Sequence, residues 1–349
     1  MEKKRVLIAM SGGVDSSAAV LLLQRQGYDC GGAMLQLYTD DVSAAADSAR
    51  DARQVASALG IPFYLLDEQA AFRQQVMDAF IEAYCRGLTP NPCILCNRYL
   101  KFGVLFERAR TMGYDYLATG HYARVGFDTA TGKYLLLRGM DHRKDQSYVL
   151  YQLTQHHLAH LLLPVGETNK TSVRAALEAA ALPIARKPDS QDICFIPGGD
   201  YVAFLQQSGV KLTPGNFVDA AGNILGQHKG LPCYTLGQGK GLGIALGRHV
   251  YVTAKNDADN TVTLGDNADL FSRELTAHSV NWISGEVPAE PFTCTAKTRY
   301  SQSEAACLVA PLPGGRMQVV FDTPQRAITP GQAAVLYHGD IVLGGGTIE

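Results

Sequence analysis

The stretch from Ser11 to Ser17 constrains the fold of this chain more than any other part of its sequence. It reads Ser-Gly-Gly-Val-Asp-Ser-Ser and directly follows the apolar run Val6–Met10. An apolar run that ends in two glycines is typical of a buried parallel strand that leads into a tight loop. Apolar residues then recur near helical spacing as far as Gly27, a residue type that commonly follows a helix end. The sequence therefore predicts a strand, a glycine loop and a helix, in that order.

A loop of this kind suits a phosphate group. Backbone N–H groups at a helix start lack intrahelical acceptors, and the helix dipole favours a negative charge there. Ser11, Ser16 and Ser17 add hydroxyl donors. The stretch has neither the Gly-Lys-Ser/Thr ending of a Walker A loop nor the Gly-x-Gly-x-x-Gly pattern of a dinucleotide-binding turn. An ordinary glycine turn is the alternative, and the serines and Asp15 around the glycines make it the weaker one.

These residues resemble the phosphate loop of the PP-loop ATP pyrophosphatases, whose pattern is Ser-Gly-Gly-x-Asp-Ser. Members of that superfamily cleave ATP between the α and β phosphates and adenylate an oxygen atom of a second substrate. The resemblance implies an ATP site that works with Mg²⁺. The ATP-binding residues that it implies are Ala9, Met10, Ser11, Gly12, Gly13, Val14, Asp15, Ser16, Leu35 and Gly120.

Length and composition limit the class of protein. A chain of 349 residues with 46% hydrophobic and 18% charged residues has room for two or three globular domains. No apolar run approaches the roughly 18 residues of a membrane helix, and the first residues show no signal-peptide pattern, so we expect a cytoplasmic protein without a membrane partner. The net charge of −2 argues against a uniformly basic nucleic-acid-binding surface. The glycine-rich segment 206–256 carries five Lys or Arg against one acid, which is equally consistent with phosphate-backbone contact and with a solvated face.

Beyond the loop, apolar runs alternate with amphipathic segments. This alternation favours an α/β fold with a doubly wound parallel sheet and a site at the carboxyl ends of its strands. Strands are expected at 32–38, 61–67 and 114–119, helices at 47–59, 70–84, 98–110 and 170–181, and a hairpin at 128–136. Short β-like runs with glycine turns follow residue 201, and short strands alone follow residue 274, as in a small closed barrel. We therefore expect domains at 1–200, 201–268 (small, basic and β-rich) and 269–349 (a β-barrel).

The eight cysteines do not suggest a disulfide framework in a cytosolic chain. Cys93 and Cys96 form a Cys-x-x-Cys pair on a proline-containing loop that we expect at the start of a helix. A helix start lowers a thiol pKa, so an increased thiolate fraction is expected there. The pair alone is equally compatible with half a zinc site, a redox pair or cluster ligands. Cys194 is expected in a short apolar strand, where a packed core thiol is the alternative. Thiols packed in the core are also expected at Cys30, Cys233, Cys294 and Cys307.

Three histidines, His156, His157 and His160, share a polar stretch of the sequence. Positions 156 and 160 lie on one helix face, which is a spacing that two zinc ligands can adopt. No glutamate completes a His-Glu-x-x-His arrangement, so surface histidines are the favoured interpretation.

Four separated motifs resemble the tRNA-specific 2-thiouridylase family across nearly the whole chain. They are the PP-loop, the Asn-Pro-Cys-x-x-Cys-Asn loop at 91–97, the Asp-Ser-Gln-Asp-Ile-Cys-Phe-Ile stretch at 189–196 and Pro-Gly-Gln-Ala-Ala-Val-Leu-Tyr at 330–337. That family replaces O2 of the wobble uridine of tRNA with sulfur. The resemblance implies an adenylated tRNA intermediate, a barrel that binds tRNA, and a sulfur-donor partner such as a cysteine desulfurase or a sulfur-relay carrier. The tRNA contacts that it implies are Lys144, Asp145, Gln146, Arg299 and Tyr300.

The resemblance also implies the sulfur chemistry. Cys194 would carry a persulfide, and Cys96 would resolve it by forming a disulfide. Several family members have an aspartate, thought to act near the target base, where this chain has Cys93. With a cysteine there, Cys93, Cys96 and Cys194 could instead ligate a [4Fe-4S] cluster that accepts exogenous sulfide.

Two functions from other classes remain open. A PP-loop amidotransferase or ligase would adenylate a small acid, and it would need neither the cysteine motifs nor the barrel. A non-catalytic RNA-binding module would have no use for Asp15 and Ser16 in the phosphate loop. Pyrophosphate release that depends on tRNA would separate the first of these from a thiolase.

Overall fold

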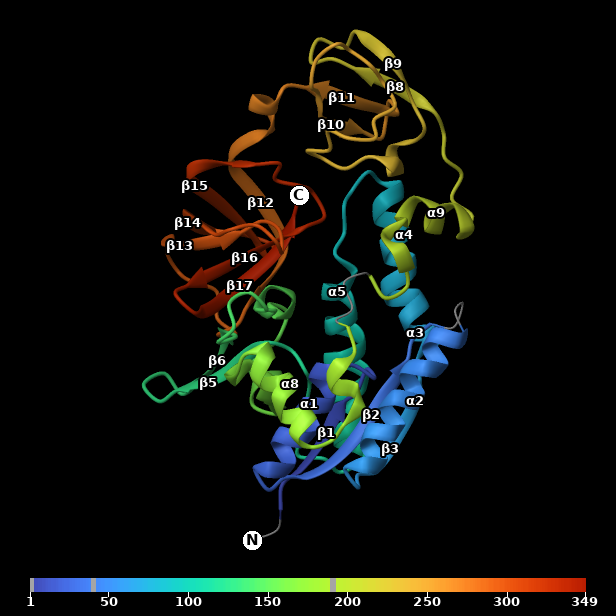
Figure 1. Ribbon diagram of the computed structural model, residues 1–349. Coiled ribbons are helices and arrows are strands. Elements are labelled where there is room, and N and C mark those ends of the chain that lie inside the picture. The colour runs from blue at the N-terminus through green and yellow to red at the C-terminus, as the bar shows by residue number, and fades with distance from the viewer. Residues whose placement is uncertain (1–2, 39–41, 189–192) are drawn as a thin grey trace.

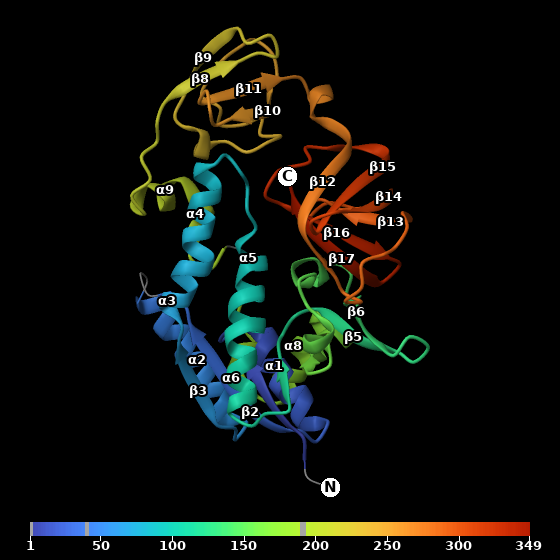
Figure 2. The same cartoon turned by 180° about the vertical axis from the view of Figure 1, so that it is seen from behind.

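The computed structural model describes residues 3–38, 42–188 and 193–349. An α/β part carries the N-terminus, and a β-barrel and a pair of long helices stand side by side above it (Figure 1). A small β-rich middle domain lies across the far end of both. The reverse view in Figure 2 shows the same arrangement. Within these described ranges, no helix is both long enough and apolar enough to cross a bilayer.

The α/β part is built on an open parallel sheet, which confirms the predicted doubly wound fold. The order of its described strands is β3-β2-β1-β4-β7. The strand order thus reverses beside β1, and the crevice at such a reversal, at the carboxyl ends of the strands, is the usual ligand site. The strands are β1 (Arg5–Ala9), β2 (Asp29–Gln36), β3 (Phe63–Asp67), β4 (Tyr116–Ala118) and β7 (Leu161–Leu162).

Each face of this sheet is covered by its own helices. Val6 and Ile8 pack with α1, α2 and α8 on one face, whereas Leu7 packs with α6 on the other. Burial on both faces explains why β1 is a continuous apolar run instead of an alternating one. The helices are α1 (Val14–Arg25), α2 (Val42–Ala58), α6 (Leu105–Thr111) and α8 (Lys170–Ala179).

Two long helical segments rise from the sheet and pack against each other (Figures 1 and 2). The first confirms the helix predicted at 70–84, and the second begins at Pro92, earlier than predicted. Proline is compatible with the first position of a helix, and the Asn91 side chain caps this one by accepting from the Cys93 N–H. Cys93 and Cys96 therefore lie within the first helical turns and not on a preceding loop. The segments are α3 (Gln69–Phe72), η1 (Arg73–Met77) and α4 (Asp78–Cys85), then α5 (Pro92–Leu95), η2 (Cys96–Val104) and α6, with π-helical geometry in η1 and η2.

The strand predicted around Cys194 is wrong. Ile193 to Ile196 form a turn, which leads into the short helix η6 (Pro197–Gly199). Phe195 inserts among Phe72, Phe80 and Phe204, with ring centroids 5.2–5.6 Å apart. An apolar run of four residues is compatible with a strand or with a packed turn, and here aromatic packing decides.

The C-terminal part is the predicted closed barrel. Six described strands follow the order β12-β15-β14-β13-β16-β17, and a β12–β17 pairing closes the ring. The predicted hairpin is present as β5 and β6, and it extends the barrel sheet through the pairing of β6 with β17. The strands are β12 (Phe271–Trp282), β13 (Phe292–Lys297), β14 (Ala305–Leu312), β15 (Arg316–Arg326), β16 (Ala333–His338) and β17 (Ile341–Ile348), with β5 (Ala123–Asp128) and β6 (Lys133–Arg138).

The middle domain has a separate small core around Phe217, Tyr234 and Val252. Its described strands follow the order β10-β11-β8-β9. They are β8 (Gly215–Val218), β9 (Ile224–His228), β10 (Tyr251–Asn256) and β11 (Thr261–Gly265). The remaining helices are α7 (Gln155–Leu158), α9 (Tyr201–Gln207), η3 (Ser147–Leu150), η4 (Pro164–Glu167), η5 (Pro183–Arg186), η7 (Leu231–Cys233) and η8 (Asn267–Leu270).

Candidate active site

The phosphate loop lies at the reversal of strand order, between β1 and α1. Gly12 has φ +67°, and a Cβ placed on it would lie 2.2 Å from the Ser48 carbonyl oxygen of α2. A Cβ on Gly120, which follows β4, would lie 2.6 Å from the Ser16 nitrogen. Both glycines are therefore required by close backbone approach. The residues predicted to bind ATP come together here, at the carboxyl ends of β1, β2 and β4.

Hydroxyl groups brace the loop from within. The Ser16 hydroxyl accepts from the Ser11 N–H at 3.1 Å and donates to the Gly13 carbonyl at 3.2 Å. Ser17 donates to the same carbonyl at 2.8 Å. Gly13 itself is the N-cap of α1 and provides no side-chain cap. The N–H groups at the start of this helix are therefore left for a ligand or solvent.

Asp15 is held by two side chains that the sequence did not single out. Its Oδ1 accepts from the Tyr122 hydroxyl at 2.8 Å and from Lys170 Nζ at 2.7 Å. A second lysine, Lys187, donates to the Gly12 carbonyl at 2.8 Å and to the Asp51 carboxylate at 2.7 Å. No local motif marks either lysine, because their partners in the loop lie more than 150 residues away in the sequence.

His121 lies next to the predicted ATP-binding residue Gly120 and was not among the site residues predicted from the sequence. It follows Gly120, is buried, and its Nδ1 lies 2.7 Å from the Thr119 hydroxyl. Burial, reinforced by the positive charge of Lys101, holds the pKa of His121 well below its usual value, so the ring is neutral at pH 7. In the sequence, the signal that could have identified His121 is its position directly after Gly120, which was predicted to bind ATP.

The three cysteines lie within electrostatic range of one another. The Cys194 thiol interacts with both Cys96 and Cys93, and Cys96 interacts with Cys93. Cys96 is buried, whereas Cys93 and Cys194 are accessible to solvent. The turn that replaces the expected strand thus brings Cys194 to the start of the second helical segment.

The expected lowering of the thiol pKa values is wrong. Desolvation by the surrounding protein raises the pKa of Cys93 and Cys96, and it raises that of Cys194 to about 12. Lys101 acts in the opposite direction on all three thiols but does not compensate. The dipole at the helix start favours the thiolates of Cys93 and Cys96, but burial has the larger effect on their pKa values here.

The residues expected to contact tRNA fall into two groups. Tyr300 donates from its hydroxyl to the Asp145 carbonyl at 3.1 Å, and burial, the Asp145 charge and the nearby Cys93 raise the Tyr300 pKa. Gln146 Oε1 accepts from the Tyr122 N–H at 3.0 Å. Asp145 and Gln146 therefore connect Tyr122, the partner of Asp15, with Tyr300 of the barrel. Lys144 beside them is exposed.

Arg299 belongs to the second group, away from the thiols. Its guanidinium donates to the carbonyls of Leu236 and Ala327 and to the Thr329 hydroxyl. It therefore joins the barrel to the middle domain.

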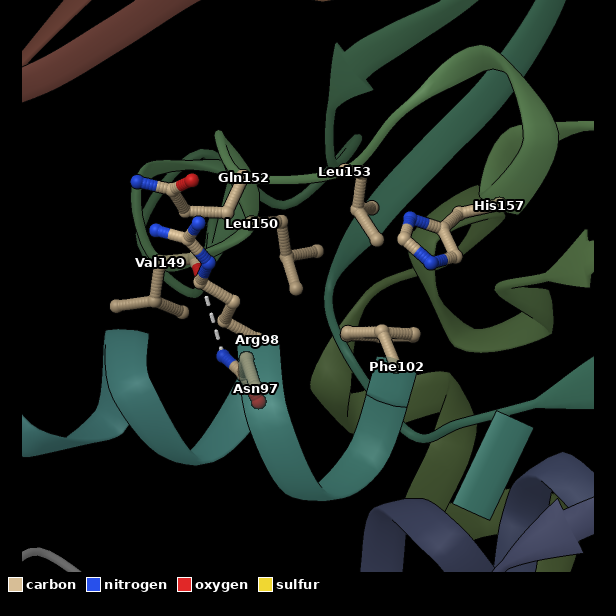
Figure 3. Close-up of a pocket in the computed structure, with 8 residues that line it drawn as sticks. All are labelled: Asn97, Arg98, Phe102, Val149, Leu150, Gln152, Leu153 and His157. Atoms are coloured by element: carbon tan, nitrogen blue, oxygen red, sulfur yellow. Dashed lines mark hydrogen bonds between the residues drawn. The ribbon is translucent and has the colours of Figure 1, made fainter. Parts of the chain in front are cut away.

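Two hollows adjoin this region. A cavity of about 20 Å³, enough for one water molecule, lies beside the helix that carries Cys96. Figure 3 shows Asn97, Arg98 and Phe102 of that helix facing the short helix η3, which carries Val149. The Asn97 amide donates to the Val149 carbonyl at 3.0 Å. A wider, open groove of about 610 Å³ lies near Lys170, and its lining residues are Met140, Asp141, His142, Arg143, Asn169, Thr171 and Ser172.

A metal or cluster site is not preformed in the described part of the chain. No group of three or more His, Cys, Asp or Glu side chains there is arranged to hold a metal ion. The three thiols therefore do not fit a cluster in this arrangement. His156 lies 2.9 Å from Arg110, between ring nitrogen and guanidinium, and His157 caps its own helix, as surface histidines do.

Family models cover the chain in three consecutive blocks. The tRNA methyl transferase HUP domain matches residues 4–198, the tRNA methyl transferase PRC-barrel domain matches residues 202–266, and the aminomethyltransferase beta-barrel domain matches residues 272–348. The tRNA-specific 2-thiouridylase MnmA of Acetivibrio thermocellus is 47% identical over 100% of both chains. That of Moorella thermoacetica is 50% identical over 98% of this chain and 99% of its own.

The chain belongs to the tRNA-specific 2-thiouridylase family. Among solved structures, the U34-tRNA thiolase NcsA from Methanococcus maripaludis with its [4Fe-4S] cluster matches at 15% identity and a TM-score of 0.38. That match covers 59% of this chain and 64% of the other, and it is too weak to support an argument.

Proposed function

We propose that this 2-thiouridylase-family protein performs ATP-dependent 2-thiolation of the wobble uridine, U34, of tRNA. The observation that supports it most is a series of hydrogen bonds that runs from the phosphate loop to Tyr300, a residue close enough to Cys93 to be affected by its charge. Asp15 accepts from the Tyr122 hydroxyl, Gln146 accepts from the Tyr122 N–H, and the neighbouring Asp145 carbonyl accepts from Tyr300. Besides burial and the Asp145 charge, the charge of Cys93 raises the pKa of Tyr300. An activated base between these two ends would meet both ATP and sulfur.

The first step activates a poor leaving group. O2 of the uridine attacks the α-phosphorus of ATP, and the bond to the β-phosphate oxygen breaks, which gives an O2-adenylated tRNA and pyrophosphate. Loop N–H groups at the start of α1 would stabilise the charge that develops on the phosphates. Mg²⁺ accompanying ATP supplies further charge neutralisation.

The second step exchanges oxygen for sulfur. The terminal sulfur of a Cys194 persulfide attacks C2 of the base, and AMP leaves with its bonding electrons. The Cys96 thiol, deprotonated, then attacks Cys194 Sγ and breaks the S–S bond to the transferred sulfur, which stays on the tRNA. The Cys96–Cys194 disulfide that results is returned to two thiols by an external dithiol. The mutual proximity of these two thiols supports this order.

The cluster route is the competing source of sulfur. Within the described residues, the three thiols do not form a preformed metal site. Purification without oxygen distinguishes the routes, because a [4Fe-4S] protein shows broad visible absorption and about four irons per chain. Iron-free protein that thiolates tRNA would support the persulfide route, and an iron-dependent activity would reject it.

The tRNA itself would be held along several surfaces. We propose contacts from Lys144, Asp145 and Gln146 near the site and from Arg299 and Tyr300 in the barrel, with a flipped uridine beside the thiols. The open groove flanked by His142 and Arg143 extends this surface. We further propose the domain limits 1–200, 201–268 and 269–349, a cytoplasmic location, and a cysteine desulfurase or sulfur-relay carrier as the sulfur donor.

Pyrophosphate release is the direct test of the activation step. We expect release from ATP to depend on tRNA with uridine at the wobble position, and Asp15→Ala to reduce it. Release that instead requires a small acid or ammonia would favour an amidotransferase or ligase. ATP-independent tRNA binding without turnover would favour an RNA-binding module.

A separate variant tests the sulfur carrier. Cys194→Ala should abolish 2-thiouridine formation while tRNA-dependent AMP transfer stays measurable. Thiolation that persists in this variant would remove Cys194 from the mechanism.

A further inference from the structure

The Gly12–Gly13 peptide is held in position by Lys187 and by close contact with α2. Lys187 Nζ donates to the Gly12 carbonyl at 2.8 Å and to Asp51 Oδ2 at 2.7 Å. The Ser48 carbonyl also approaches Gly12 so closely that no Cβ fits. Ser48 and Asp51 both belong to α2, so this helix packs against the phosphate loop.

Fixing this carbonyl also fixes the next N–H. In a planar trans peptide, the C=O of one residue and the N–H of the next point in opposite directions. Because Lys187 holds the Gly12 carbonyl toward α2, the Gly13 N–H points away from α2. Gly13 is the N-cap of α1, where the free N–H groups and the dipole favour an anion.

The lysine is itself held in place by α8. Arg174 Nη1 donates to the Lys187 carbonyl at 3.0 Å and to the Ala185 carbonyl at 2.6 Å. Arg174 lies one helical turn beyond Lys170, which binds Asp15 at 2.7 Å. One helix therefore anchors two lysines that contact the phosphate loop.

The charge of Lys187 is already matched. Its ammonium and the Asp51 carboxylate form an ion pair in which both side chains are partly buried, 35% and 26% exposed. A paired cation contributes little net attraction for phosphate, whereas its hydrogen bond to the loop remains. The geometry thus favours a role in shaping the loop over direct binding of ATP.

We propose that Lys187 is a positioning residue that presets the Gly12–Gly13 peptide, so that the loop N–H groups face the ATP phosphates before the nucleotide binds. This proposal rests on the ATP-dependent function proposed above. In this proposal, Asp51 orients the Lys187 ammonium and Arg174 holds the Lys187 backbone.

Binding measurements test the consequence for affinity. Loss of a charged hydrogen bond predicts that Lys187→Met weakens ATP and inorganic pyrophosphate about 10- to 100-fold by calorimetry. Adenosine, which lacks phosphates, should bind unchanged, and Lys187→Arg should recover most of the pyrophosphate affinity. Lys133→Met is the matched control, since Lys133 also forms a short ion pair, with Glu286 at 2.6 Å. Unchanged pyrophosphate binding, or an equal loss for adenosine, would overturn the proposal.

A ligand-free readout separates positioning from direct phosphate contact. With glycine labelled at both the ¹³C-carbonyl and the ¹⁵N positions, an NMR experiment that correlates each carbonyl carbon with the next amide detects only Gly-Gly peptides. The sequence has six of them. The Gly13 amide signal, assigned by its loss in Gly13→Ala, should shift in Lys187→Met without nucleotide and stay in place in Lys133→Met. An unshifted signal would overturn the positioning role. Wild-type protein that binds ATP and pyrophosphate but does not thiolate tRNA would reject the proposed function and leave this inference standing.

Discussion

The thiols of Cys93, Cys96 and Cys194 are each affected by burial and by the nearby positive charge of Lys101. Lys101 lies in the π-helical segment η2 that begins at Cys96. Burial disfavours the thiolates and Lys101 favours them, with burial the larger effect. The resting thiols are therefore mainly protonated at pH 7, and a nucleophilic sulfur must be generated during the reaction.

Alkylation rates should report this protonation. With its pKa raised to about 12, Cys194 should react with iodoacetamide about a thousandfold more slowly at pH 8 than an ordinary cysteine. The rate should rise about tenfold per pH unit well beyond pH 9, because only the thiolate reacts. Mass spectrometry of the peptide that contains Cys194 provides the measurement.

Lys101→Met is the control for this experiment. It removes the cation, so it should slow alkylation of Cys194 further at every pH below the thiol pKa. A rate that levels off near pH 8.5 in the wild type would contradict the raised pKa.

At the scale of elements, the site depends on close approach between segments that are distant in sequence. The turn after β4 packs against the first turn of α1, and α8 reaches the same helix through the Lys170–Asp15 pair. The second helical segment presents its cysteines to the turn at 193–196. A substitution that moves any of these elements apart should therefore weaken ATP binding.

Gly120→Ala tests the approach of β4 to α1. The added methyl group would lie 2.6 Å from the Ser16 nitrogen and 2.7 Å from the Asp15 carbonyl carbon, both backbone atoms that cannot move alone. We expect a loss of about 1–3 kcal/mol in the free energy of unfolding and weaker ATP binding, measured by urea denaturation and calorimetry.

Gly126→Ala is the matched control. Its new methyl group meets the movable end of the Leu137 side chain at 3.1 Å, so ATP binding should not change. If Gly120→Ala bound ATP with the wild-type affinity, the proposed dependence of the ATP site on the close packing of Gly120 against α1 would be wrong.

Across the whole molecule, the tip of the helical pair touches both β domains. Thr89 donates its N–H to the Pro330 carbonyl at 3.0 Å, and its carbonyl accepts from the Gln332 side chain at 2.7 Å. On the other side, Lys255 of the middle domain packs near Gly87 and donates to the Tyr234 carbonyl at 2.7 Å. The loop that leads to Cys93 is thereby fixed from both sides.

Lys255 makes this junction sensitive to pH. Burial lowers its pKa from 10.5 to about 8. Between these values the unfolded chain keeps the proton that the folded chain has released, so the free energy of unfolding rises with pH. From pH 7 to pH 10 the wild type should gain about 1–3 kcal/mol relative to Lys255→Met, as measured by urea denaturation at each pH. Parallel curves for the two proteins would contradict the lowered pKa.

Local patterns in the sequence were sufficient for the sheet, the phosphate loop, the hairpin and the barrel. Each of these depends on nearby residues, such as the apolar run before Gly12. Lys170 and Lys187 were not predictable in this way, because only the fold brings them to the loop. The thiol pKa values depend on burial that only the folded chain creates, and the turn at Cys194 depends on the packing of Phe195. Arg299 and Tyr300 are adjacent in sequence, yet Arg299 bonds to Leu236 of the middle domain and Tyr300 bonds to Asp145.

The central claim is that one site couples ATP cleavage to sulfur transfer. Its most direct test quantifies AMP and 2-thiouridine in the same reaction of purified protein, ATP, a sulfur donor and unmodified tRNA. We predict one AMP for each 2-thiouridine, formed at the wobble position, and neither product from tRNA with cytidine at that position. 2-Thiouridine formed without AMP, or AMP released equally from the cytidine tRNA, would contradict it.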